Sequence, residues 1–208
     1  KIMFIIMSVV GVSILHTPYW FNPKIHNFGN IGLGGRIHAE IAKIATVTID
    51  NIRYHGRNIR EEIYDNYENK VILDLCCGVG ISTAPGGIGV DTSVEMLNVA
   101  RRDKSKEFYC GNAENFNLNK RIDIVTCMFA FHEMPIEGQL KVKENAERLA
   151  KEEVIIVDIS SNYKPKEIML SGEPYLINYL NNIDYVLEDY NKEIYIKDHV
   201  TVWRKSIF

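Results

Sequence analysis

From residue 70 onward, short apolar runs alternate along the chain with segments of helical periodicity. The runs are nearly continuous in apolar residues, which is the pattern of strands buried on both faces of a parallel sheet. This alternation predicts an α/β fold with a Rossmann-like, doubly wound sheet. The expected strands lie at 71–75, 88–90, 108–109, 122–128 and 154–157, and the expected helices between them lie at 94–102 and 139–150.

The C-terminal segment completes the predicted sheet. A helix is expected at 174–187, and two strands follow at 193–196 and 200–204. The short connection between these strands favours antiparallel pairing. The chain therefore predicts a mostly parallel, seven-stranded sheet with an antiparallel C-terminal strand.

Two helices are expected before the first strand, at 37–52 and 59–67. A glycine-rich segment, 28–35, precedes them and is a candidate hinge. We divide the chain into an N-terminal apolar arm with a helical lid, 1–69, and a Rossmann-like core, 70–208.

The uncharged, mostly apolar run at 2–15 has two interpretations. It is shorter than the roughly 20 residues that span a bilayer, and no small-residue cleavage site follows it. It is therefore either a membrane-proximal or targeting segment or a helix that packs on the domain. The four cysteines are too few for a disulfide scaffold in 208 residues and are expected to be reduced. We expect a cytoplasmic protein, with membrane association through 2–15 as the alternative to packing.

The charge balance argues against a nucleic-acid partner. Lys and Arg number 24 against 27 Asp and Glu, which gives a net charge of −3 and no global basic field. P-loop, CxxC and GxSxG motifs are absent from the sequence. The sequence does not predict an oligomeric state.

The strongest motif is the segment 71–80, VILDLCCGVG. A buried strand contains Asp74 and runs directly into a turn with Gly78 and Gly80. Ligands of open parallel sheets bind beyond the carboxyl ends of the strands, and glycine allows the main chain to approach them closely. The dinucleotide pattern GxGxxG is not met, and an acidic residue here favours a cationic ligand over a diphosphate.

This segment resembles motif I of the class I S-adenosylmethionine (SAM)-dependent methyltransferases, roughly D/E-x-G-x-G-x-G. Cys76 stands where the first glycine of the pattern usually lies. The resemblance implies SAM as cofactor, S-adenosylhomocysteine (SAH) as product, and a methionine pocket formed by Asp74, Cys76, Gly78 and Gly80.

Three further segments, 89–93, 108–114 and 123–135, match the family in order. Asp91 ends the second strand, where the family's acid binds the ribose hydroxyls. Asn112 replaces the Asp that usually follows the third strand, and its amide oxygen can still accept a hydrogen bond from the adenine amino group. The other cofactor-binding residues that the resemblance implies are Thr92, Met96, Ala113, Glu114 and Phe129.

One departure from the family lies between the first two strands. Only residues 81–90 separate Gly80 from Asp91, and they include Pro85, Gly86 and Gly87. This length leaves no room for the usual helix of three turns. The first crossover is therefore expected to be shortened.

His132 and Glu133 lie where family members place residues that face the substrate, and they are the catalytic candidates. In one interpretation His132 is a base or orienting group with Glu133 beside it. In the other it is a loop histidine that contacts the cofactor or the backbone. The pair lacks the second histidine of HExxH, so no metal is expected.

The substrate-binding candidates come from the N-terminal segment and from a late loop: Tyr19, Trp20, His26, Glu173 and Tyr175. The alternative is that the aromatic residues fill the seam between the arm and the sheet. His38 and His55 are expected to be surface or helix-contact residues.

The resemblance implies methyl transfer from SAM to a small-molecule acceptor, either a metabolite or a lipid-like compound. The alternative is a catalytically degenerate binding or regulatory module, favoured by Cys76, Asn112 and the shortened crossover. A nucleic-acid methyltransferase is disfavoured by the charge and by the missing N/D-P-P-Y/F element.

Overall fold

The computed structural model describes residues 18–65 and 67–208. The apolar segment 2–15, for which a membrane-proximal or packing role was expected, lies outside the described residues. None of the helices within the described ranges combines the length and apolar character needed to cross a membrane.

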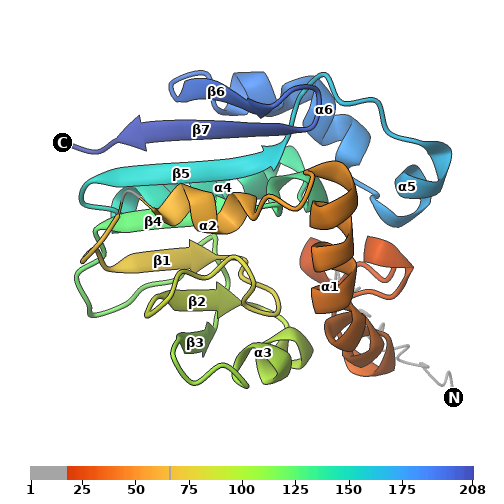
Figure 1. Ribbon diagram of the computed structural model, residues 1–208, viewed down its shortest axis with the longest axis horizontal. Coiled ribbons are helices and arrows are strands. Elements are labelled where there is room, and N and C mark those ends of the chain that lie inside the picture. The colour runs from red at the N-terminus through yellow and green to blue at the C-terminus, as the bar shows by residue number, and fades with distance from the viewer. Residues whose placement is uncertain (1–17, 66) are drawn as a thin grey trace, which may run out of the picture.

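A seven-stranded sheet runs through the described part of the chain (Figure 1). Its strands are β1 Ile72–Leu75, β2 Ile88–Asp91, β3 Glu107–Cys110, β4 Ile124–Met128, β5 Glu153–Ile159, β6 Asn191–Ile196 and β7 Val200–Ser206. They lie in the order β3-β2-β1-β4-β5-β7-β6. The pairs from β3 to β5 are parallel, whereas β7 is antiparallel to both β5 and β6. The predicted fold class is confirmed.

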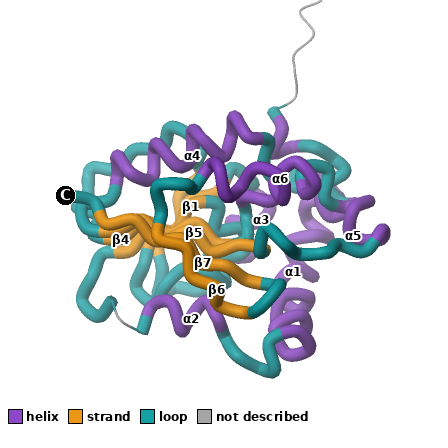
Figure 2. Tube along the Cα trace, turned by 90° about the horizontal axis from the view of Figure 1, so that it is seen from above, coloured by secondary structure: helices purple, strands orange, loops and turns teal. Residues whose placement is uncertain are grey.

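Helices cover both faces of the sheet. Figure 2 shows α4 and α6 on one side of the strands and α2 on the other. The α-helices are α1 Gly32–Arg53, α2 Ile59–Tyr64, α3 Val94–Ala100, α4 Ile136–Leu149, α5 Glu167–Gly172 and α6 Leu176–Val186. The short 3-10 helices within 18–65 and 67–208 are η1 Tyr19–Phe21, η2 Ile25–Asn27 and η3 Phe131–Glu133.

The apolar strands supply two cores, one on each face of the sheet. In β4, Val125 and Cys127 belong to the core beneath α4 and α6, whereas Ile124 and Met128 belong to the core beneath α2. Successive residues of a strand point to opposite faces, so a continuous apolar run serves both cores. This explains why the sequence of these strands shows no polar alternation.

The shortened first crossover is confirmed. No helix lies between β1 and β2 in the described chain, where residues 76–87 form turns. The face of the sheet that lacks this helix is covered by α2, which precedes β1. Its residues Ile59 and Ile63 are at most 1% exposed and pack in the second core.

The glycine-rich segment 28–35, a candidate hinge, is partly helical. Its second half, from Gly32, forms the first turn of α1. A Cβ atom on Gly34 would lie 2.1 Å from the carbonyl oxygen of Phe28, and one on Gly35 would lie 2.5 Å from the carbonyl carbon of Asn30. These glycines are therefore explained by the close approach of the preceding loop to the helix.

The helix α5 was not predicted, and α2 ends earlier than expected.

Candidate active site

A cavity of about 690 Å³ lies beyond the carboxyl ends of β1, β2 and β4. Its floor includes Cys76, Asp91 and Phe129, the residues at or just after the ends of these strands, and α1 forms part of its wall. Pockets for drug-sized ligands measure roughly 300–1,000 Å³. The cavity therefore occupies the position and has the size of a small-molecule site in an open α/β sheet.

The turn after β1 presents its backbone to the cavity. Cys76 and Gly78 both have positive φ, at 61° and 52°, and both line the cavity. A Cβ atom on Gly78 would meet no atom within 4 Å, so a ligand can approach this backbone closely. Gly80 differs because it does not line the cavity. A Cβ atom there would lie 2.6 Å from the Phe108 ring, which explains this glycine by packing.

Asp91 ties this turn to the end of β2. Its Oδ2 accepts the N–H of Gly78 at 2.8 Å, and its Oδ1 accepts the N–H of Ser93 at 2.8 Å. Burial raises the pKa of Asp91 to about 6, and the backbone hydrogen bonds oppose this shift. Each carboxylate oxygen has a second lone pair, so Asp91 retains acceptor capacity toward a ligand. Thr92 and Met96 line the cavity beside it.

Asp74 lies elsewhere than predicted. Leu73 and Leu75 face the α4 side of the sheet, so strand alternation directs Asp74 to the α2 side. Its carboxylate is fully buried, accepts hydrogen bonds from Thr83 and Thr126, and is not among the residues that line the cavity. The geometry therefore does not support a direct role in the methionine pocket. Burial raises the pKa of Asp74 to about 7.

The segment after β3 contributes Asn112 and Ala113 to the cavity wall. The Oδ1 atom of Asn112 accepts the N–H of Glu114 at 2.9 Å, so the amide oxygen expected to face adenine already has one donor. Glu114 lies outside the cavity lining, and its carboxylate accepts the hydroxyl of Tyr19 at 2.8 Å. Phe129 lines the cavity with a φ of 56°.

His132 forms a buried pair with Asp158. Its Nδ1 lies 2.6 Å from Asp158 Oδ1, and its backbone N–H donates to Asp158 Oδ2 at 3.2 Å. Burial alone would lower the pKa of His132, but the negative charge of Asp158 and the hydrogen bond to it raise this pKa to about 9. His132 lines the cavity, and Nδ1 is the ring nitrogen engaged by Asp158.

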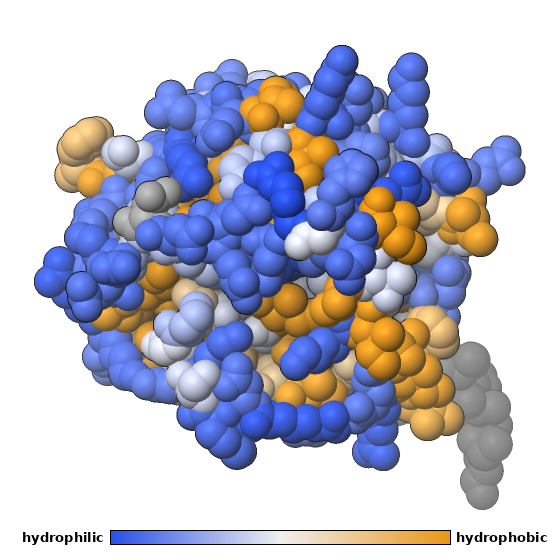
Figure 3. Space-filling model, in the orientation of Figure 1, coloured by the Kyte–Doolittle hydropathy of each residue, from blue (hydrophilic) through white to orange (hydrophobic). Residues whose placement is uncertain are grey.

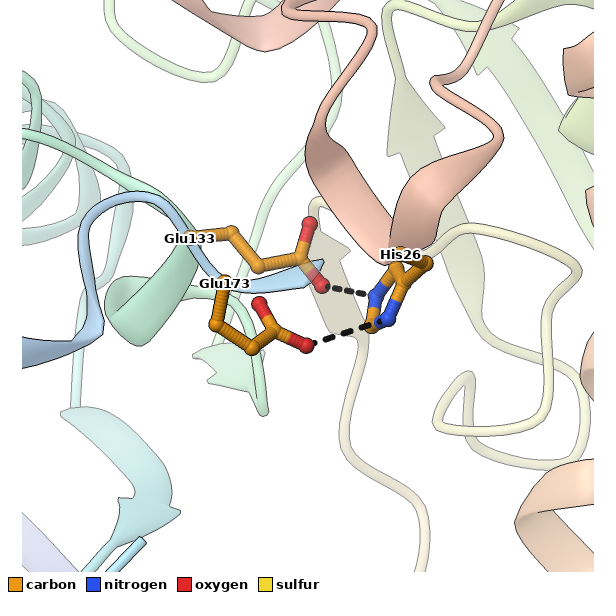
Figure 4. A group of neighbouring side chains, drawn as sticks. All are labelled: His26, Glu133 and Glu173. Carbon is orange, nitrogen blue, oxygen red and sulfur yellow. Dashed lines mark hydrogen bonds and ion pairs between the residues drawn. The ribbon is translucent and has the colours of Figure 1, made fainter. Parts of the chain in front are cut away.

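Three of the candidates, His26, Glu133 and Glu173, lie next to one another (Figure 4). Nε2 of His26 lies 2.8 Å from Oε1 of Glu133, and Nδ1 lies 3.1 Å from Oε1 of Glu173. Burial lowers the pKa of His26, but the two carboxylates outweigh it and raise this pKa to about 11. Burial raises the pKa of Glu133, yet His26 beside it lowers the value to about 2. Glu133 is therefore an ionised partner of His26 and a poor proton acceptor.

The aromatic substrate-binding candidates separate into two groups. Tyr19 and Trp20 line the cavity, with ring centroids 4.9 Å apart in an edge-to-face arrangement. Tyr175 does not line it and instead packs edge-to-face on Tyr19, at 6.2 Å. Tyr175 therefore supports the aromatic wall from behind.

Several cavity residues were not among the candidates. One face of α1 contributes Ile41, Ala42, Ala45, Thr46 and Ile49. His38, expected to be a surface or helix contact, lies in the cavity wall, 4.7 Å from the His26 ring, and bonds to the carbonyl oxygen of Gly29. Burial and the positive charge of His26 lower the pKa of His38. The helical periodicity of α1 was a signal for this face, but it does not distinguish a core from a ligand cavity.

Another part of α1 faces solvent. Leu33 is 75% exposed, Ile44 71% and Ile52 70%. Figure 3 shows apolar surface over this helix. The helix therefore has apolar residues both toward the cavity and toward water.

Comparison with protein families matches residues 72–153 to a family described as "Methyltransferase domain". The match begins with β1 and ends at the start of β5, so it covers the strands whose ends form the cavity floor. The chain contains a class I SAM-dependent methyltransferase domain. The fold and the family expected from the motifs are thereby confirmed. A search of curated proteins gave no match.

Solved structures of methyltransferases share this fold at low identity. A SAM-dependent methyltransferase of Aquifex aeolicus is 19% identical, with a TM-score of 0.54 over 72% of this chain and 90% of that chain. The magnesium protoporphyrin IX methyltransferase of Synechocystis, solved with bound SAH, is 16% identical, with a TM-score of 0.53 over 89% and 92%. A SAM-dependent methyltransferase of Clostridium acetobutylicum is 17% identical, with a TM-score of 0.51 over 80% and 98%. SAM, the cofactor of this family, is the cofactor expected from the motifs.

Proposed function

We propose that this chain binds SAM in the described cavity and transfers its methyl group to a small-molecule acceptor. One observation carries the proposal: most of the expected cofactor residues line the same cavity as the expected catalytic pair, His132 and Glu133. The two sets come from segments far apart in the sequence. Their convergence at the carboxyl edge of a parallel sheet is typical of a cofactor site with reactive groups beside it.

The residues around the turn after β1 fit SAM. The open space above Gly78 leaves room for a ligand against the backbone. Asp91 keeps lone pairs free to accept the ribose hydroxyls, and Asn112 and Ala113 line the wall where the adenine is expected. When bound, SAM supplies an electrophilic methyl group on a positively charged sulfur.

The chain's own contribution is alignment, exclusion of water and control of one proton. The apolar face of α1 covers the cavity and reduces the access of water. Asp158 engages Nδ1 of His132, so Nε2 is the ring nitrogen through which the neutral form of His132 can accept the acceptor's proton. Because the pKa of His132 is raised to about 9, the share of this neutral form grows as the pH rises toward that value. We propose His132 as the base and Glu133 as a residue that holds His26 in place.

The proposed acceptor is a small molecule bound between α1, Trp20 and the His26 side of the cavity. The apolar α1 face accommodates the hydrocarbon part of a metabolite or lipid-like compound. The exposed apolar residues of the same helix support binding close to a membrane surface. Of the lid expected at 1–69, we propose that η1, η2 and α1 act over the cavity, and Trp20 and His26 belong to this part.

Calorimetric titration of the purified chain with SAM and with SAH tests cofactor binding directly. We expect both to bind. Incubation with SAM carrying a labelled methyl group and a metabolite extract then tests transfer, with label expected in a small-molecule fraction. Absence of binding by either compound would contradict the proposal and favour the degenerate module. Label transferred to nucleic acid would contradict the acceptor class.

A further inference from the structure

We propose that His26, Glu133 and Glu173 form a binding site for a divalent transition-metal ion at the acceptor side of the cavity. The three side chains come from η2, η3 and the segment that follows α5. Each offers a nitrogen or oxygen donor atom, and these atoms all lie within 4.8 Å of one another. Figure 4 shows the two carboxylates converging on the imidazole.

The spacing of these donors is close to that of a coordination shell. Metal bonds of about 2.1 Å to imidazole nitrogen and carboxylate oxygen place the ligand atoms about 3–4 Å apart. Nε2 of His26 lies 2.8 Å from Glu133, and Nδ1 lies 3.1 Å from Glu173, so the two contacts use different ring nitrogens. A common ion would bind one of these nitrogens, and the carboxylate beside the other nitrogen would turn toward the ion.

An unpartnered atom independently points to a missing ligand. Glu173 is only 7% exposed, and its Oε2 is buried without a hydrogen-bond partner. A buried carboxylate oxygen without a donor is costly, and such atoms in native structures call for an explanation such as an ion. A cation held by Glu173 would supply the missing interaction.

The charge of the cluster favours a dication. Both nitrogens of His26 face carboxylate oxygens, which only accept hydrogen bonds, so the imidazole carries protons on both nitrogens. The positive imidazolium and two carboxylates leave one net negative charge. A dication that displaces one imidazole proton to solvent and binds the neutral imidazole and the two carboxylates leaves none, which suits a partly buried site better.

The backbone holds His26 in this position. His26 has a φ of 48° and a ψ of 21°, in the left-handed region that L residues rarely adopt. A Cβ atom on Gly172 would lie 3.3 Å from the His26 Cα, so glycine at that position lets η2 approach the end of α5 closely. The chain therefore brings the imidazole to Glu173 at a backbone cost.

The donor set selects the class of ion. One imidazole and two carboxylates suit borderline ions such as Zn²⁺ and Mn²⁺ better than Mg²⁺, which prefers oxygen ligands alone. A role in the reaction rests on the proposed function. There, the ion's charge would favour ionisation of a hydroxyl bound beside it.

Metal titration of the chelator-treated, full-length protein tests the site. By calorimetry we expect a single site that binds either Zn²⁺ or Mn²⁺, and that binds Mg²⁺ more weakly. Binding of Mn²⁺ should also be visible by electron paramagnetic resonance. His26→Ala and Glu173→Gln should each weaken binding at least tenfold. The exposed residues His55 and Glu137 provide matched controls, because His55→Ala and Glu137→Gln should leave the affinity unchanged.

Two results would overturn the site. One is the absence of Zn²⁺ and Mn²⁺ binding by the folded protein. The other is binding that both cavity variants leave unchanged, which would place the ion elsewhere, for example on the free cysteines. SAH titration and thermal unfolding of each variant confirm that it is folded. Retained SAH binding with no metal binding would refute this site and leave the proposed function intact.

Discussion

The backbone N–H of Gly78 donates a hydrogen bond of 2.8 Å to Oδ2 of Asp91. This bond joins the turn after β1 to the end of β2. The two strands are adjacent and parallel, so residues separated by a shortened crossover meet at one edge of the cavity. The turn and the carboxylate are therefore expected to act on a ligand together.

Replacing Asp91 with alanine should weaken SAH binding about 10- to 100-fold. The ligand loses a charged acceptor, worth about 1.5–3 kcal/mol, and the turn at Gly78 loses its anchor. Calorimetric titration with SAH measures the effect. Asp103→Ala on the exposed surface is the control, and equal affinities in the two variants would contradict the role of Asp91.

The two glycines of the turn should respond differently to alanine. Gly78→Ala adds a methyl group in the space left for the ligand and strains a φ of 52°, so it should lower SAH affinity and reduce stability by about 1 kcal/mol. Gly80→Ala places its methyl group against the Phe108 ring and should mainly reduce stability, by about 1–3 kcal/mol. Urea unfolding and SAH titration separate the two effects. A larger loss of SAH affinity at Gly80 would reverse our assignment.

Replacing His132 with asparagine should lower turnover at least 100-fold while changing SAH affinity less than threefold. The asparagine amide can take the place of Nδ1 as a donor to Asp158, but it removes the proposed proton acceptor. Turnover with the identified acceptor and SAH titration measure the two quantities. The control is His55→Ala, which alters an exposed histidine outside the cavity lining. Equal losses of turnover and affinity would indicate a structural contact.

Asp74→Asn tests the position of this carboxyl group on the α2 side of the sheet. SAH affinity should change less than threefold, because Asp74 does not line the cavity. Burial raises the pKa of Asp74 from 3.8 to about 7, so the folded state binds more protons than the unfolded state between these values. Stability of the parent protein should therefore fall as pH rises from about 4 to about 7, by on the order of 4 kcal/mol from this group.

Asparagine removes this titration, so the variant should lose less stability across the same window and be the more stable protein at pH 8. Urea unfolding at several pH values measures both proteins. Parallel stability curves would contradict the raised pKa. A large loss of SAH affinity would restore Asp74 to the cofactor site.

The sequence predicts the sheet because burial on both faces leaves a clear pattern in strands such as β1 and β4. The sequence is less informative about the direction in which side chains point at the site. The motif placed Asp74 in the cofactor pocket, although strand alternation with Leu73 and Leu75 turns it to the other face. The glycine content of 28–35 was also misleading about the start of α1, because Gly34 lies in this helix and the close approach of Phe28 explains why it is a glycine.

The convergence of His26, Glu133 and Glu173 could not be predicted from the sequence. These residues are far apart in the chain, and their meeting depends on the positive φ of His26 and on the close approach that Gly172 allows. The motifs locate residues along strands and their ends. They do not determine how a separate N-terminal segment folds over those ends.

The helix α2 has a consequence for how this protein can be divided. Ile59 and Ile63 shield the side of the sheet that the missing crossover helix would otherwise cover. A recombinant fragment that begins at β1 would expose this apolar face to water and precipitate during expression. The smallest version that stays in solution should therefore start upstream of Ile59, well ahead of the first strand.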